Sequence, residues 1–199
     1  MHPAKSFAWD DVSAMAAFAR DIAFAHLCVA GPDGPIVAHA PLLVAEDGSV
    51  LVHLSRGNRI LRHLDGATIV ASIAAHDFYV SPDWYEAKDS VPTWDYVAVE
   101  IEGTARLLDQ AELVAQLDGL SAEHEARLAP KPAWTRDKMP EGRFDAMLSG
   151  ISGFSIDAPT WRGTRKLSQN RAAADRAGVI AALETTRPDL AALVAQERG

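Results

Sequence analysis

Two glycine-containing turns divide the apolar sequence between residues 26 and 55 into three short runs. The turns are Pro-Asp-Gly-Pro at 32–35 and Glu-Asp-Gly-Ser at 46–49, and glycine readily adopts the positive φ that such turns need. The runs are rich in valine, leucine and alanine, and they cover 26–30, 36–45 and 50–55. Short runs joined by tight turns predict an antiparallel meander, which is the strongest constraint on the fold.

Further segments extend the β pattern and add helices. Alternating and β-branched residues predict strands over 68–81, 96–108 and 151–157. Helical spacing predicts helices over 10–24, 58–66, 110–128, 142–149 and from residue 170 onward. Strands outnumber crossover helices in the first half. We therefore expect a mainly β fold of the α+β kind, an antiparallel barrel with added helices, rather than a doubly wound parallel sheet.

The charge balance and the hydropathy argue against several classes of protein. The formal net charge of −8 opposes nonspecific binding to nucleic acid, and no block of consecutive Lys or Arg offsets it. No segment approaches the roughly 18 apolar residues of a membrane span. The single cysteine, Cys28, cannot form an intramolecular disulfide. We expect a cytoplasmic protein without a membrane span, and direct DNA contact stays an open question.

The first candidate site is Leu-Ser-Arg-Gly-Asn-Arg at 54–59, where a strand is expected to end and a helix to begin. Backbone N–H groups at a helix start attract anions, and Ser55 and Arg56 add side-chain donors. A phosphate group would fit this set. The alternative is an ordinary turn in which Asn58 caps the helix and the arginines are solvated.

The second candidate is a pair of histidines. A hairpin turn centred near Asp47 places Pro41 roughly opposite His53, so that His39, Pro41, His53 and Ser55 share one face. Two histidines on one face could begin a metal site, but spacing indicates no third ligand, and we assign no metal. The alternative is that both are half-buried strand residues.

Two more stretches carry polar or aromatic side chains. Trp84, Tyr85, Trp94 and Tyr96 lie within thirteen residues and suit either a flat ligand or a minor core under a loop. Residues 165–171 supply donors for carbonyl or phosphate oxygens, or else simply cap the following helix. No nucleophile–base arrangement is visible, so the catalytic residues, if there are any, stay unassigned.

These stretches occur together in an order that resembles the PaiB-type family, described as FMN-binding negative transcriptional regulators. The resemblance covers nearly the whole chain. It rests on five motifs, which are Ala-His-Ala-Pro-Leu-Leu at 38–43, Val-His-Leu-Ser-Arg-Gly-Asn at 52–58, Tyr-Val-Ser-Pro-Asp-Trp-Tyr at 79–85, Val-Pro-Thr-Trp-Asp-Tyr at 91–96 and Lys-Leu-Ser-Gln-Asn-Arg at 166–171.

The resemblance implies an antiparallel split β-barrel that forms a homodimer with FMN at the subunit interface. It implies a split-barrel FMN-binding domain with helical insertions over residues 1–165, and a C-terminal helical segment packed on the barrel over 166–199. By the same analogy, Leu54, Ser55, Arg56 and Asn58 hold the phosphate, His39, Ala40 and Pro41 run beside the flavin ring, and Trp94, Lys166 and Gln169 close the site, from the same or the partner subunit.

The chain departs from the family pattern at three places near this site. Ala38 and Ala40 flank His39 where threonine and leucine are usual, and Gly57 and Arg59 stand where alanine or proline is common. Asp95 stands where asparagine is more usual. A carboxylate beside a phosphate is unfavourable, so we expect Asp95 to face Arg, Lys or water.

The function implied is an FMN-binding homodimer of the negative transcriptional regulator type. One alternative is an FMN-dependent oxidoreductase that uses a nicotinamide donor. Another is a haem or flavin carrier in which His39 or His53 ligates iron.

Overall fold

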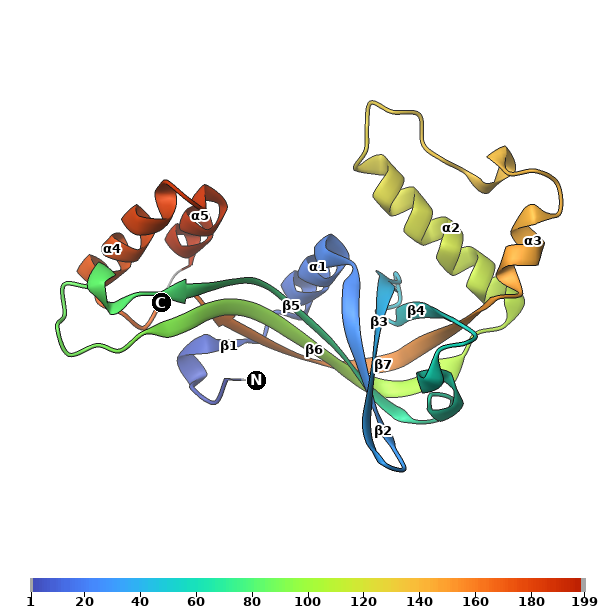
Figure 1. Ribbon diagram of the computed structural model, residues 1–199, viewed down its shortest axis with the longest axis horizontal. Coiled ribbons are helices and arrows are strands. Elements are labelled where there is room, and N and C mark those ends of the chain that lie inside the picture. The colour runs from blue at the N-terminus through green and yellow to red at the C-terminus, as the bar shows by residue number, and fades with distance from the viewer. Residues whose placement is uncertain (1, 198–199) are drawn as a thin grey trace. The chain divides into compact units, whose positions relative to one another are not determined.

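The computed structural model describes residues 2–197, and the strands in this range form one sheet (Figure 1). The strands are β1 (Ala8–Trp9), β2 (Phe24–Gly31), β3 (Gly34–Val44), β4 (Val50–Ser55), β5 (Thr68–Val80), β6 (Thr93–Leu107) and β7 (Ile151–Lys166). The sheet order is β1-β7-β4-β3-β2-β5-β6, and β6 also pairs with β7. Strands β2 to β7 therefore pair in a ring, with β1 attached to β7.

Most of the helices lie in the second half of the chain, between β6 and β7 or after β7. They are α1 (Val12–Ile22), α2 (Gln110–Ala126), α3 (Arg143–Leu148), α4 (Ala173–Glu184) and α5 (Pro188–Gln196), with 3-10 turns at Lys5–Phe7, Arg59–His63, Pro82–Trp84 and Arg136–Lys138. The mainly β fold with added helices is confirmed. Residues 1, 198 and 199, which belong to the expected segments 1–165 and 166–199, lie outside the described residues.

The meander expected over residues 26–55 is confirmed. Strands β2, β3 and β4 pair antiparallel, with Phe24 opposite Pro41 and Leu42 opposite Val52. The turn glycines adopt the positive φ that the sequence predicts, +123° at Gly34 and +84° at Gly48. Glycine has no side-chain clash there, so each turn closes without strain.

The core is built from alternate positions of the strands. In β3, Ala38, Ala40 and Leu42 are buried, whereas the residues between them point outward. Val97, Val99 and Ile101 of β6 are buried as their alternation predicts. A period of two therefore decides which face of each strand is available to a ligand.

Two strands are longer than the sequence indicates. Strand β6 begins at Thr93 instead of Tyr96, and β7 continues to Lys166 instead of ending near Asp157. The last part of β7 pairs with β1, Ala8 opposite Thr164 and Trp9 opposite Gly163. Local alternation is weak there, and the pairing with a distant strand defines the extension.

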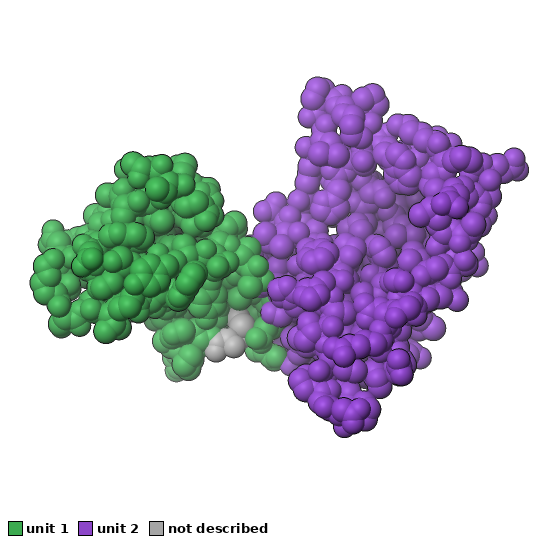
Figure 2. Space-filling view, in the orientation of Figure 1, with its two compact units in different colours: residues 1–11, 74–100, 162–199 green, residues 12–73, 101–161 purple. Residues whose placement is uncertain are grey.

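The described chain divides into two compact units, coloured separately in Figure 2. Unit 1 consists of residues 1–11, 74–100 and 162–199, and unit 2 of residues 12–73 and 101–161. Each unit is described by itself below. Between residues 2 and 197, no helix has the length and apolar character needed to span a membrane.

Candidate functional site

The turn after β4, in unit 2, presents the side chains expected to hold a phosphate. Ser55 and Arg56 are exposed, and the Asn58 Oδ1 atom accepts a hydrogen bond from the Ile60 N–H at 3.2 Å. Asn58 therefore caps the following turn as predicted, but that turn is a 3-10 helix of five residues, Arg59–His63. Since the cap uses a backbone donor, the anion-binding capacity of this turn rests mainly on Ser55 and Arg56.

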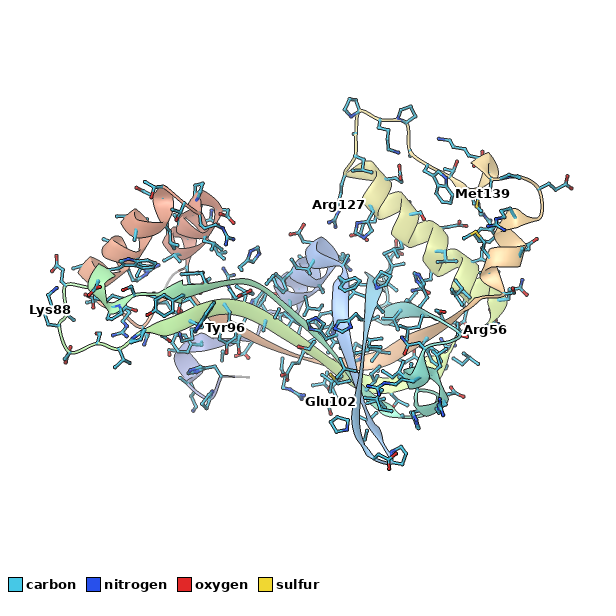
Figure 3. The ribbon with its side chains drawn as sticks, in the orientation of Figure 1. Arg56, Lys88, Tyr96, Glu102, Arg127 and Met139 are labelled. Atoms are coloured by element: carbon cyan, nitrogen blue, oxygen red, sulfur yellow. The ribbon has the colours of Figure 1, made fainter. Side chains whose placement is uncertain are left out.

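Arg56 is held in place by the start of β7. Its Nε atom donates to the Ile151 carbonyl at 3.0 Å, and its backbone N–H donates to the Gly150 carbonyl at 2.9 Å. Figure 3 labels Arg56 where β4 ends beside β7. The backbone bond fixes the chain at this turn, and the Nε bond orients the guanidinium of an exposed residue, which suits recognition of an anion.

A pocket of about 430 Å³ opens beside Arg56 in unit 2. Its lining includes Asp109, Asp145 and the strand residues Ser152 and Gly153. The two carboxylates outweigh the single guanidinium, so the pocket itself is a poor place for a phosphate. The exposed turn at Ser55 and Arg56 is the better place for one.

The outward face of β3 and β4 carries the other residues predicted in unit 2. His39 and Ser55 are exposed, Pro41 and His53 are half-buried, and the register Leu42 to Val52 agrees with the hairpin that the sequence predicts. Ala40 and Leu54, in contrast, belong to the buried face. Any contact between these two residues and a ligand on the outward face would use their backbone.

The histidines on this face have different partners. His39 lies opposite His26 on β2, with ring centroids 4.8 Å apart and planes at 86°. His53 Nδ1 lies 3.4 Å from Nε2 of Gln116, a buried residue of α2. Within residues 2–197, no group of three His, Cys, Asp or Glu side chains could hold a metal ion.

Gln116 is a residue that the sequence analysis missed. It is fully buried on α2, and its Oε1 atom has no hydrogen-bond partner among residues 2–197. Gly153 lets the helix approach β7 here, because an added Cβ would lie 2.9 Å from both Leu108 and Leu113. No local pattern in the sequence indicates that α2 covers His53.

Lowering the pH from about 7 to about 5 is expected to destabilise the wild-type protein more than a His53→Gln variant. Burial holds the pKa of the His53 imidazole below its usual value of 6.5. Between the folded and unfolded pKa values the unfolded chain binds more protons, so the stability contributed by neutral His53 is lost as the pH falls. Thermal melts across this range measure the effect. If the melting temperatures of the two proteins changed equally with pH, His53 would not be a buried neutral imidazole.

In unit 1, the aromatic residues divide into buried and exposed members. Tyr85 is buried, whereas Trp94 is 56% exposed, and its ring meets that of Tyr79 edge to face, with centroids 6.0 Å apart. Tyr96, labelled on β6 in Figure 3, is half-buried. Trp94 is therefore not a core residue, and its ring remains available to a flat ligand.

The segment from Lys166 to Arg171 folds onto the strand start that carries Trp94. Asp95 is 1% exposed, and it accepts hydrogen bonds from Lys166 Nζ at 3.1 Å and Ser168 Oγ at 2.6 Å. Lys166 also donates to Thr93 Oγ1 at 2.8 Å and to the Trp94 carbonyl. The expectation that Asp95 faces a cation is confirmed. The same Lys166 ammonium holds the backbone carbonyl of Trp94.

Gln169 has an internal role of the same kind. Its Oε1 atom accepts from the Leu167 N–H at 2.8 Å, and its Nε2 atom donates to the carbonyls of Ser6 and Arg165 at 3.1 and 2.6 Å. Lys166 and Gln169 thus use their polar atoms within unit 1. The residues predicted at 39–58 lie in unit 2, and Trp94, Lys166 and Gln169 lie in unit 1.

Curated proteins with similar sequences come from bacteria and fungi. The protease synthase and sporulation protein PAI 2 of Bacillus subtilis is 29% identical over 171 residues, which cover 84% of this chain and 81% of that protein. An uncharacterised protein of Emericella nidulans is 28% identical over 160 residues, which cover 72% of this chain and 63% of the fungal protein.

Solved structures share the fold at low sequence identity. An FAD and haem binding protein of Mycobacterium smegmatis aligns with a TM-score of 0.57 and 19% identity, covering 77% of this chain and 70% of that one. A flavocytochrome of Azotobacter vinelandii aligns with a TM-score of 0.59 and 18% identity, covering 83% and 72%. These likenesses support the split-barrel fold class.

A family match covers most of the chain. Residues 1–159 match the family described as "Putative FMN-binding domain". Together with the similarity to PAI 2, this match confirms the resemblance that the five sequence motifs indicate. The chain therefore belongs to this FMN-binding-domain family, that of the PaiB-type proteins.

Proposed function

We propose that this protein binds FMN, with the phosphate on the exposed turn of Ser55 and Arg56 and the flavin ring along the outward face at His39 and Pro41. The observation that carries the proposal is the guanidinium of the exposed Arg56, which the Ile151 carbonyl orients. A charge-assisted, directional donor beside a serine hydroxyl fits a phosphate monoester. Bound FMN would supply one- and two-electron redox chemistry.

We further propose that the working form is a homodimer in which Trp94 of a second copy contacts the flavin. The exposed Trp94 ring supports this proposal, since a large aromatic surface held on a fixed backbone suits stacking. Lys166 and Gln169 would act by shaping the segment that carries Trp94. A twofold axis would create two equivalent sites.

We propose a role in negative regulation from the resemblance of the five motifs to the PaiB-type family, and the net charge of −8 favours an indirect role over nonspecific DNA binding. The visible spectrum of the purified protein distinguishes the main alternatives. Flavin absorption bands that disappear on release of FMN support the proposal, and oxidation of NADH or NADPH by that form would identify an oxidoreductase. A Soret band would instead identify a haem carrier.

Replacing Arg56 with alanine is expected to weaken FMN binding about 10- to 100-fold, because a hydrogen bond to a charged group contributes about 1.5–3 kcal/mol. Titration of the apoprotein with FMN, followed by quenching of flavin fluorescence, measures the effect. The matched control is Arg62→Ala, which removes an exposed arginine from the adjacent 3-10 turn. Equal affinities for the Arg56→Ala variant and the wild type would show that the phosphate lies elsewhere.

A further inference from the structure

A second pocket, of about 340 Å³, lies within unit 1 beside the buried Asp95. Of the residues proposed for FMN, only Lys166 lines it. Phe7, Val91 and Pro92 contribute apolar lining, and Tyr85, Asn170 and Arg171 contribute polar lining. A concave site that combines apolar walls with a few convergent donors suits a small amphipathic molecule.

The hydroxyl of Tyr85 is the feature that points to a ligand. Tyr85 is 2% exposed, and its hydroxyl makes no hydrogen bond of good geometry within residues 2–197, although Arg171 and Ser168 lie near it. Burial raises the pKa of this phenol, and the nearby charge of Arg171 partly opposes the shift. A buried hydroxyl without a well-formed hydrogen bond is unfavourable unless a group in the pocket accepts a hydrogen bond from it.

Arg171 lies over the Tyr85 ring and lines the same pocket. Its guanidinium carbon lies 4.4 Å from the centroid of the Tyr85 ring, and its NH1 atom donates to Ser90 Oγ at 3.2 Å. These contacts, together with a weak interaction with the Tyr85 hydroxyl, orient the planar group. A guanidinium held in this way can bind a planar carboxylate with two parallel hydrogen bonds.

The charge of the lining selects a monoanion. Asp95 is the one carboxylate among the lining residues, and the Lys166 ammonium at 3.1 Å compensates it. The formal charges of Asp95, Lys166 and Arg171 therefore sum to +1. A single carboxylate balances this charge, whereas a dianionic phosphate would leave an excess negative charge near buried Asp95.

We propose that the pocket in unit 1 binds a small carboxylic acid, whose carboxylate is held by Arg171 and the Tyr85 hydroxyl and whose apolar part lies against Phe7, Val91 and Pro92. The site differs from the one proposed for FMN. It would give the protein a second small-molecule binding site, whose occupancy does not depend on flavin.

Benzoate is the probe, and neutral benzamide, which has nearly the same shape, is its control. Isothermal titration of the wild-type protein is expected to detect benzoate binding and at least tenfold weaker binding of benzamide, because the amide lacks the charge that Arg171 would pair with. Equal binding of the two compounds, or no binding of benzoate, would overturn the proposal. Displacement of benzoate by FMN would also overturn it, since the pocket would then belong to the flavin site.

Two variants test the named donors. Tyr85→Phe is expected to leave the melting temperature of the free protein unchanged or raised, since the hydroxyl makes no internal hydrogen bond of good geometry, yet to weaken benzoate binding about tenfold. Arg171→Lys keeps the charge but removes the fork of donors, so it is expected to weaken binding by a similar factor. The exposed Arg187→Lys change in unit 1 is the matched control and is expected to leave the benzoate affinity unchanged.

The melting temperature of each free variant separates a loss of benzoate binding from a folding defect. A lower melting temperature for free Tyr85→Phe protein would show that the hydroxyl has an internal structural role, and the proposal would fail. Unchanged benzoate affinity in either the Tyr85 or the Arg171 variant would also contradict it.

Discussion

Asp95→Ala is expected to lower the free energy of unfolding by about 3 kcal/mol or more, because it leaves the Lys166 ammonium largely buried without its carboxylate. The Lys166 side chain is 12% exposed, and Asp95 Oδ1 lies 3.1 Å from its Nζ atom. The substitution also removes the acceptor of Ser168 Oγ. Urea unfolding of the two proteins, followed by circular dichroism, measures the difference.

A double variant and a surface control make this prediction specific. Asp95→Ala combined with Lys166→Met is expected to be more stable than Asp95→Ala alone, since neither charge is then left unpaired. Asp189→Ala removes the partner of Arg187 in an exposed ion pair and is expected to leave stability nearly unchanged. A small effect at Asp95, equal to that at Asp189, would show that the buried pair is not stabilising the strand start.

Gly178→Ala is the second substitution with a large expected effect. Gly178 lies in α4, and an added Cβ would lie 1.9 Å from the Trp84 carbonyl oxygen in the 3-10 turn Pro82–Trp84. The same turn region is tied to α4 by Asp175, which accepts the N–H groups of Glu86 and Ala87 at 2.9 and 3.2 Å. Because the backbone must move to admit the methyl group, we expect the free energy of unfolding to fall by about 3 kcal/mol.

Gly119→Ala in α2 is the matched control for this substitution. An added Cβ there would meet only the end of the Leu43 side chain, at 3.0 Å, which can move. Alanine is favoured over glycine in a helix by about 1 kcal/mol, so the control is expected to be neutral or stabilising. If Gly178→Ala were also stabilising, the close approach of α4 to the turn at Trp84 would be wrong.

The parts of the site that follow from local pattern were predictable. Alternation along β3 and β4 placed His39 and Pro41 on the outward face, and the turn chemistry at Gly34 and Gly48 fixed the register between the strands. Asn58 also caps its turn as the sequence suggests. Each of these features depends on residues close together in the chain, where spacing alone carries the information.

The contacts between distant segments were not predictable in the same way. The pairing of His53 with Gln116 and the packing of α2 at Gly153 join residues more than 35 positions apart. Likewise, the sequence left open whether Trp94 belongs to a core or to a ligand site. The structure excludes a core role for Trp94, because it leaves this residue exposed while burying Tyr85.

The sequence by itself determined the mainly β fold, the outward face of the meander, the Ser55–Arg56 turn and membership of the PaiB-type family. Only the tertiary structure decided the role of Asp95, which the sequence marked as a departure from the family. Asp95 accepts hydrogen bonds from Lys166 and Ser168, so this buried carboxylate is paired and holds the start of β6 in place. A charge acquires its role from the groups that surround it, and spacing in the chain does not specify those groups.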